Sequence, residues 1–426
     1  MVELIWDNKQ KMLKELGDML NSEPNCRFEI DRDSSKDVGT TGNLYIEGDN
    51  LDALRLLRED YTGKVKMIYI DPPYNTEKKF VYRDKFRNNS KECRHSGWLN
   101  MMYPRLKLAK DLLRDDGVIF ISIDDVELEN LKKICNELYG EGNFIACVIW
   151  ERAYSPVNLK KHFSESHDFI LCYAKSIEQL NCNGLKRSDE ANDRYSNPDN
   201  DERGVWKSSD LSVGPAVQNN IYEITTPSGR KAMPPSGYSW RLSRDKFDEF
   251  VRDNRIWFGV DGSNVPSIKR FLNEVKQGIT PMTVWKYADV GHSQKASQDL
   301  KKLFDNNAFF TYPKPVELIQ RLLELYSNND SMILDFFSGS ATTAHAVMQL
   351  NAEDGGNRKF IMVQLPEPCD GKSEAYKAGY KNICEIGKER IRRAGEKIKE
   401  EVIAKGKDKQ TPDIGFKVLT VIKNEN

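Results

Sequence analysis

The chain has 426 residues, of which 30% are charged and 39% hydrophobic, and its formal net charge at pH 7 is -1. This composition is typical of a globular protein with a polar surface. It excludes a membrane protein, because the longest dense apolar stretches, 118–123 and 144–150, are far shorter than the ~20 residues that span a bilayer. A near-zero charge also excludes a strongly basic protein, so any nucleic-acid surface must be a local patch.

The N-terminus and the cysteines indicate the compartment. Met1-Val2-Glu3 does not open a signal peptide, so we expect a cytoplasmic protein. The eight cysteines contain no CxxC pair and several stand in apolar runs, which predicts reduced core thiols. Cysteines and histidines do not recur at zinc-site spacing, so no metal is expected.

The first half of the chain alternates strand and helix patterns. Residues 1–20 predict an amphipathic helix that packs on the protein, and the polar residues 21–43 predict a linker. Short apolar runs then predict buried strands, separated by helical stretches at 51–57 and 99–113. The predicted strands are 44–46, 65–70, 117–123, 144–150 and 169–173. This alternation predicts an α/β fold with a mostly parallel sheet.

The amino-acid composition changes at about residue 181, where Asn, Asp, Ser, Pro and Gly become frequent. The alternation of strand and helix patterns stops there and resumes at about residue 300. This stretch contains Trp206, Trp240, Trp257 and Trp285 among many Arg and Lys residues. Aromatic rings among basic residues suit base stacking and phosphate contact; the alternative is a mixed module whose tryptophans form its core. We predict a separate module at 181–300.

The α/β pattern resumes after residue 300, with predicted strands at 333–337 and 360–365 around a helix at 342–350. A Lys/Glu-rich stretch at 388–407 predicts a solvated helix. The expected organisation is therefore a helix and linker at 1–43, one half of the core at 44–180, the module at 181–300, and the second half of the core at 301–426.

The most specific motif is Asp71-Pro72-Pro73-Tyr74, directly after the buried strand 65–70. Open α/β sheets bind ligands at the carboxyl ends of their strands. Asp71 and the Pro72 carbonyl can each accept one hydrogen of an amino group, and the Tyr74 ring offers a stacking face to a flipped base. The alternative is a proline turn capped by Asp71.

A second motif, Asp335-Phe-Phe337-Ser-Gly339-Ser-Ala341-Thr-Thr343, joins a strand to a helix. Its small residues let backbone amides approach a ligand, as in nucleotide-type cofactor sites. The motif is not GxGxxG, so it is a poor match to a dinucleotide site. The alternative is a tight strand-to-helix turn.

With these motifs the chain resembles the β group of amino-methylating DNA methyltransferases, most closely the modification subunits of type III restriction systems. The resemblance covers nearly the whole chain and follows the permuted motif order of that group. The landmarks, in chain order, are Gly48-Asp49-Asn50, Asp71-Pro72-Pro73-Tyr74, Tyr312-Pro313-Lys314-Pro315 and Phe337-Ser338-Gly339-Ser340. The implied fold is a Rossmann-like, circularly permuted methyltransferase core with an inserted target recognition domain at 181–300.

The resemblance implies S-adenosylmethionine as cofactor. Lys314 and Pro315 are expected at its methionine end, Asp49 near its adenine, and Gln364 or Glu367 at its ribose, where the family usually has a carboxylate. The remaining implied cofactor residues belong to the second motif: Asp335, Phe337, Gly339, Ser340, Thr342 and Thr343. Ala341 departs from the family, which often has a third glycine there.

The resemblance also implies the reaction and the partners. Asp71, Pro72, Pro73 and Tyr74 are the expected catalytic residues for transfer of a methyl group to N6 of a flipped adenine in duplex DNA. The expected partners are a second copy of the chain and a helicase-nuclease restriction subunit.

Other functions stay open at this point. They are an N4-cytosine methyltransferase, an RNA methyltransferase, an NAD-dependent dehydrogenase, and a DNA-binding specificity subunit without catalysis. Adenine is preferred to cytosine because adenine members of the family usually have Asp at the first position of the tetrapeptide.

Overall fold

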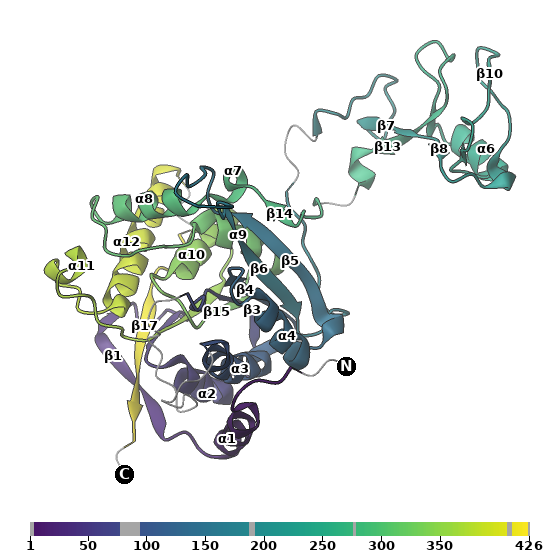
Figure 1. Cartoon of the computed structure of the whole chain (residues 1–426). Coiled ribbons are helices and arrows are strands. Elements are labelled where there is room, and N and C mark those ends of the chain that lie inside the picture. The colour runs from purple at the N-terminus through teal and green to yellow at the C-terminus, as the bar shows by residue number, and fades with distance from the viewer. Residues whose placement is uncertain (1–3, 77–93, 187–191, 276–277, 407–410, 425–426) are drawn as a thin grey trace. The chain divides into compact units, whose positions relative to one another are not determined.

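The computed structural model describes residues 4–76, 94–186, 192–275, 278–406 and 411–424. Met1–Glu3, Cys93 and Lys407, which the sequence interpretation used, lie outside these ranges. The chain forms two compact units, drawn in Figure 1: a core unit of Met1–Asn183 with Met282–Asn426, and a second unit of Gly184–Pro281.

The described part of the core unit is organised around a ten-stranded sheet, in the order β1-β17-β2-β16-β15-β3-β4-β6-β5-β14. Its strands are β1 (Cys26–Lys36), β2 (Leu44–Glu47), β3 (Val65–Ile70), β4 (Leu113–Ile123), β5 (Phe144–Glu151), β6 (His167–Ala174), β14 (Val284–Trp285), β15 (Met332–Asp335), β16 (Lys359–Gln364) and β17 (Phe416–Lys423). β1 pairs antiparallel with β17, and β6 pairs antiparallel with β4 and β5; the other pairs are parallel. The predicted mostly parallel sheet, built from both halves of the chain, is confirmed.

The described helices of the core unit form two groups, one from each half of the chain, and at least two helices of each group contact the sheet (Figure 1). The first group is α1 (Lys9–Asn21), α2 (Asn50–Tyr61), α3 (Arg94–Leu112) and α4 (Leu128–Tyr139). The second group is α7 (Tyr287–Val290), α8 (Ser293–Leu303), α9 (Val316–Tyr326), α10 (Thr342–Asp354), α11 (Glu374–Lys377) and α12 (Ile383–Ala404). None of the helices in the described ranges combines the length and apolarity that a membrane crossing requires.

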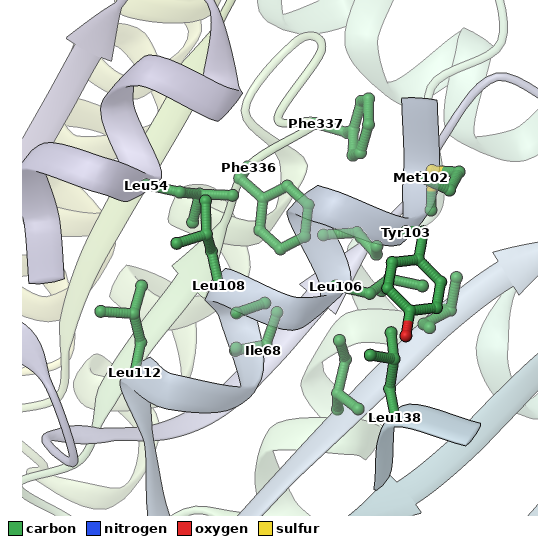
Figure 2. Packing of buried hydrophobic residues seen from close by; sticks show 14 of the residues in the cluster. Leu54, Ile68, Met102, Tyr103, Leu106, Leu108, Leu112, Leu138, Phe336 and Phe337 are labelled. Carbon is green, nitrogen blue, oxygen red and sulfur yellow. The ribbon is translucent and has the colours of Figure 1, made fainter. Parts of the chain in front are cut away.

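The core beneath the first group of helices is formed by side chains from distant parts of the chain. Figure 2 shows Leu106 and Leu108 of α3 near Ile68 of β3 and Phe336, and all four side chains are fully buried. Phe336 directly follows β15, so this core also supports the loop that leaves that strand. Parallel strands covered on both faces are expected to be mostly apolar, and all six residues of β3 are buried, including Lys66, whose ammonium pairs with Asp116 at 3.0 Å.

The predicted linker at 21–43 is wrong, because Cys26–Lys36 forms strand β1 at the edge of the sheet. β1 pairs with β17 in a register that places Cys26 opposite Lys423 and Asp31 opposite Val418. An edge strand exposes much of its surface, so its polar sequence is compatible with a strand. The pairing partner lies at the other end of the chain, and local composition does not reveal it.

The helix near the C-terminus, α12, is not simply solvated as predicted. It begins at Ile383 and buries one face, which includes the charged residues Lys388 and Arg390. The Lys388 ammonium lies 2.5 Å from a Glu47 carboxylate oxygen. Long charged side chains can therefore belong to a buried helix face when polar partners are present.

The described residues of the second unit form short strands and the α-helix α6. They are β7 (Trp206–Asp210), β8 (Ser212–Val213), β9 (Ile224–Thr225), β10 (Lys231–Ala232), β11 (Ser239–Trp240), α6 (Arg244–Arg252), β12 (Ile256–Trp257) and β13 (Ser267–Phe271). The predicted module extended to residue 300, whereas residues 282–300 belong to the core unit. The reason is the pairing of β14 with β5, which also makes Trp285 part of the core unit.

The tryptophans of the second unit form its interior. Trp206 and Trp240 are buried, and the ring centroids of Trp206 and Trp257 lie 5.2 Å apart. The fully buried Lys269 ammonium contacts the Asp199 carboxylate. The structure therefore favours the core role of these tryptophans over base stacking.

Candidate active site

Asp71 lies at the carboxyl edge of the sheet, which we define as the edge where β3, β4, β15 and β16 end. One carboxylate oxygen of Asp71, Oδ2, accepts a hydrogen bond from Lys314 Nζ at 2.5 Å. The other oxygen, Oδ1, is buried and has no hydrogen-bond partner among the described residues. Burying an unpartnered acceptor is unfavourable, so Oδ1 is positioned to accept a hydrogen bond from a ligand.

The Tyr74 ring lies beside this pair, because Lys314 Nζ is 5.2 Å from the ring centroid. Burial raises the pKa of the Tyr74 hydroxyl well above its usual value, and the nearby Asp71 carboxylate raises it further. The hydroxyl therefore stays neutral at physiological pH. Tyr74 can act through its ring and not as a base.

Two side chains that the sequence interpretation missed hold the proline turn. Trp98 Nε1 donates a hydrogen bond to the Pro73 carbonyl at 2.6 Å, whereas no described residue donates to the Pro72 carbonyl. Asn75 adopts a left-handed conformation with φ 57°, and its amide donates to the buried Glu127 carboxylate. These contacts hold the proline turn in place and leave the Pro72 carbonyl available to accept a hydrogen bond from a ligand.

The loop after β15 is organised by Asp335. Its carboxylate accepts hydrogen bonds from the Phe337 amide at 3.1 Å and the Thr343 hydroxyl at 2.6 Å. Asp335 thus connects the strand to the start of α10. Burial of the side chain raises the pKa of Asp335 to about 7, although the two hydrogen bonds favour the ionised form.

We expect Asp335 to make the protein less stable as the pH rises. The pKa of Asp335 in the folded chain lies above the unfolded value of about 3.9. At pH values between these two pKa values, the folded state therefore binds more protons than the unfolded state. The contribution to the free energy of unfolding is fully present below about pH 4 and is lost as the pH rises through about 7, at a slope of up to about 1.4 kcal/mol per pH unit. Chemical denaturation across this range should show a flatter profile for Asp335→Asn. An unchanged profile would contradict the assignment.

Gly339 lies at the centre of the loop with φ 51°, a conformation that favours glycine. An added Cβ at this position would lie 3.3 Å from Phe310 Cζ. The Gly339 amide donates to Gln364 Oε1 at 2.7 Å, and Gln364 Nε2 donates to the Leu365 carbonyl at 3.1 Å. The buried Gln364 side chain is thus committed to supporting the loop, while Glu367 is half-buried and its pKa is raised by burial.

The start of α10 is supported by Arg390, which the sequence interpretation placed on a solvated helix. One guanidinium nitrogen of Arg390 donates to the hydroxyls of Ser340 at 2.8 Å and Thr342 at 2.7 Å. Burial lowers the pKa of Arg390 to about 9. Ala341, where the family often has glycine, is buried and adopts φ 62°. The methyl group is thus accommodated in the left-handed conformation.

A cavity of about 110 Å³ joins the two motifs. Its lining includes Asp71, Lys314, Asp335, Phe337, Gly339, Ser340, Thr342 and Thr343, all singled out from the sequence. It also includes Phe310 and Tyr312, which were not predicted as site residues. The two motifs, separated by more than 250 residues of sequence, therefore open onto one space.

Other predicted site residues lie outside this lining. Pro72, Pro73, Tyr74, Gln364 and Glu367 do not line the cavity, and Pro315 precedes α9 as its N-cap residue. Asp49 is the N-cap of α2, since its carboxylate accepts from the Leu51 amide at 2.8 Å, and it also binds the fully buried Arg105 at 3.2 Å. Asp49 therefore has a structural role at the end of β2. Within the described ranges, no group of three or more His, Cys, Asp or Glu side chains could hold a metal ion.

Known proteins match the chain over most of its length. A sequence model described as DNA methylase matches residues 65–394. The chain is 37% identical over 406 residues to the type III restriction-modification enzyme StyLTI Mod subunit of Salmonella typhimurium, covering 88% of this chain and 59% of that protein. It is 31% identical over 421 residues to the EcoP15I Mod subunit of Escherichia coli, covering 84% and 64%.

A third similar protein is the EcoPI Mod subunit of Escherichia phage P1, at 34% identity over 440 residues and covering 89% of this chain and 65% of that protein. The chain thus spans 59% to 65% of the length of these three relatives. The family model covers both motifs and the whole cavity lining. The chain therefore belongs to the DNA methylase family.

Proposed function

We propose that the protein transfers a methyl group from S-adenosylmethionine to N6 of an adenine in duplex DNA, as the modification component of a restriction-modification system. The observation that carries this proposal is the cavity that Asp71 shares with the loop of Phe337–Thr343. An amino-group acceptor and a loop suited to a nucleotide-type cofactor meet there. Because the two sites share one cavity, the cofactor methyl group and the target amino group can be held close enough for direct transfer.

The residues around the loop fit S-adenosylmethionine. Gly339 leaves space that a Cβ would fill, and the buried Ser338 hydroxyl has no hydrogen-bond partner among the described residues. Lys314 would bind the carboxylate of the methionine end, and Glu367 is the better candidate for the ribose because Gln364 supports the loop. When bound, the cofactor supplies a methyl group activated by a positively charged sulfur.

Asp71 and Pro72 would act on the amino group of the target base. Asp71 Oδ1 and the Pro72 carbonyl each accept one of its hydrogens, which directs the nitrogen lone pair out of the base plane and toward the methyl carbon. The Asp71 carboxylate would stabilise the positive charge that develops on the nitrogen while the N–C bond forms and the methyl–sulfur bond of the cofactor breaks, until one N–H proton passes to water. Metal chemistry is not needed for any of these roles.

Adenine is proposed over cytosine because Asp71 occupies the first position of the tetrapeptide, where adenine-specific members of the family usually have Asp. The curated relatives named above are Mod subunits of type III restriction-modification enzymes, which supports the modification role. We further propose a restriction subunit and a second copy of the chain as partners. The second unit, Gly184–Pro281, is the proposed target recognition domain.

Single-molecule sequencing of unmethylated DNA tests the proposed function. We expect N6-methyladenine at one sequence motif after incubation with the full chain and S-adenosylmethionine, and none with an Asp71→Ala variant. N4-methylcytosine would contradict the proposed base. Methylation of RNA alone would contradict the proposed substrate, and nicotinamide binding in place of S-adenosylmethionine would contradict the class of cofactor.

Two substitutions of Tyr74 should distinguish the role of its ring from the role of its hydroxyl. Tyr74→Ala is expected to lower the rate of methyl transfer by roughly 5- to 150-fold, because base-on-ring stacking is worth ~1–3 kcal/mol. Tyr74→Phe keeps the ring and should stay close to wild type. Single-turnover methylation assays measure both variants, and equal damage by the two changes would assign the role to the hydroxyl.

A further inference from the structure

The segment between β5 and β6, residues 152–166, is a closed loop. The amides of Arg152 and Ala153 donate to the Ser166 carbonyl at 2.9 and 3.1 Å, which closes the base of the loop. Nearer the tip, the Val157 amide donates to Ser164 Oγ at 2.8 Å. The residues between these last two, 158–163, form the tip.

The tip exposes large apolar side chains almost completely. Leu159 is 97% exposed and Phe163 is 89% exposed, and Val157 beside them is 52% exposed. A single exposed leucine needs no explanation, but two nearly unburied large side chains on one six-residue tip form an apolar projection. Such a projection is unfavourable in water unless another molecule covers it.

The loop leaves the sheet at the same edge as Asp71. β5 pairs antiparallel with β6, β6 pairs antiparallel with β4, and β4 is parallel to β3, so β5 and β3 point in the same direction. The ring of Trp150, two residues before the loop, lies 5.9 Å from Lys314 Nζ. At the base, Arg152 binds Asp168 at 2.7 Å. The projection therefore arises beside the proposed target-base site.

Basic residues accompany the apolar side chains at the tip. Lys160, Lys161 and His162 stand between Leu159 and Phe163 in the sequence. Lys160 forms an ion pair with Glu165 at 2.8 Å, whereas Lys161 has no ion pair among the described residues. Apolar side chains next to positive charges match a nucleic-acid duplex, in which stacked bases lie between two rows of phosphates.

We infer that the 158–163 tip enters the DNA at the target site, with Leu159 and Phe163 taking space in the base stack and Lys161 contacting phosphate. This inference rests on the proposed function, because it names the residues that open the duplex for Asp71. Pulling a base from the stack is unfavourable, and apolar side chains that replace it lower that cost. Because the loop begins beside the proposed target-base site, a base displaced by the tip would lie near Asp71.

The test compares two duplexes in single-turnover methylation by the full chain. Both carry the site identified by sequencing; in one the target adenine is paired with thymine, and in the other it faces an abasic position. We expect the double change Leu159→Ala and Phe163→Ala to slow methylation of the paired duplex by about 10- to 100-fold. On the abasic duplex, where the target base is already unpaired, the rate should return to within a few fold of wild type.

Ile403→Ala is the matched control. Ile403 is a 49% exposed apolar residue near the end of α12, the helix that precedes β17 in the chain, and β17 runs parallel to β2. It therefore lies toward the amino edge of the sheet, and its replacement should not change either rate. A Lys161→Gln change should in addition reduce the slope of log affinity against log salt by about 0.9.

The possible outcomes are distinct. Equal losses on the two duplexes, or no loss on either, would overturn the inference. A variant that methylates both duplexes normally but no longer binds a restriction subunit would assign the tip to a protein partner and would also overturn it. If the wild-type chain methylates neither duplex, the proposed function itself fails, and the inference fails with it.

Discussion

Replacement of Asp71 by alanine is expected to reduce methyl transfer by on the order of 10³-fold or more, because the change removes an acceptor and a charge directed at the reacting amino group. Affinity for S-adenosylmethionine should stay within a few fold of wild type. Lys314 loses its partner at 2.5 Å in this variant, but its ammonium remains available to a cofactor carboxylate. Methyl incorporation into DNA measures the first effect and calorimetry the second.

Asp71→Asn is the conservative control. It keeps the size and one acceptor oxygen but removes the negative charge, so we expect an intermediate loss of activity with the same cofactor affinity. A near wild-type rate for Asp71→Ala would refute the catalytic assignment. A large loss of cofactor affinity in both variants would instead assign Asp71 to the cofactor, through its contact with Lys314.

Replacement of Gly339 by valine is expected to weaken S-adenosylmethionine binding by on the order of 10- to 100-fold, since a branched residue at φ 51° is strained by ~1–3 kcal/mol. The added Cβ also meets Phe310 Cζ at 3.3 Å, so the loop or Phe310 must move. Calorimetric titration with S-adenosylmethionine measures the loss. Thermal unfolding shows in parallel whether the variant is folded.

Gly355→Val provides a matched control at the other end of α10. Gly355 has φ 74°, so valine is strained there as well, but an added Cβ would meet no atom within 4 Å. Similar losses of stability with a loss of cofactor affinity only in Gly339→Val would assign the effect to the loop. Unchanged affinity in a folded Gly339→Val protein would refute the cofactor site.

The sequence by itself determined the elements that carry the two motifs. The strands predicted at 65–70 and 333–337 correspond to β3 and β15, with Asp71 directly after the first and Asp335 at the end of the second. Such runs are local signals, because a strand buried on both faces is mostly apolar; the one charged residue of β3, Lys66, pairs with Asp116. The turns that follow these two strands are also predictable from the local sequence, because proline and small residues favour turns. The α/β class followed from these patterns.

Only the tertiary structure decided how distant residues meet. Lys314 binds Asp71 across 243 residues of sequence, β1 pairs with a strand near the opposite end of the chain, and Trp98 holds the Pro73 carbonyl. Arg390 was predicted to face solvent, but it is buried and donates to the hydroxyls of Ser340 and Thr342. These contacts depend on where whole elements pack, which no periodicity within one segment encodes. For that reason the motifs could be recognised from the sequence, while the residues that support them could not.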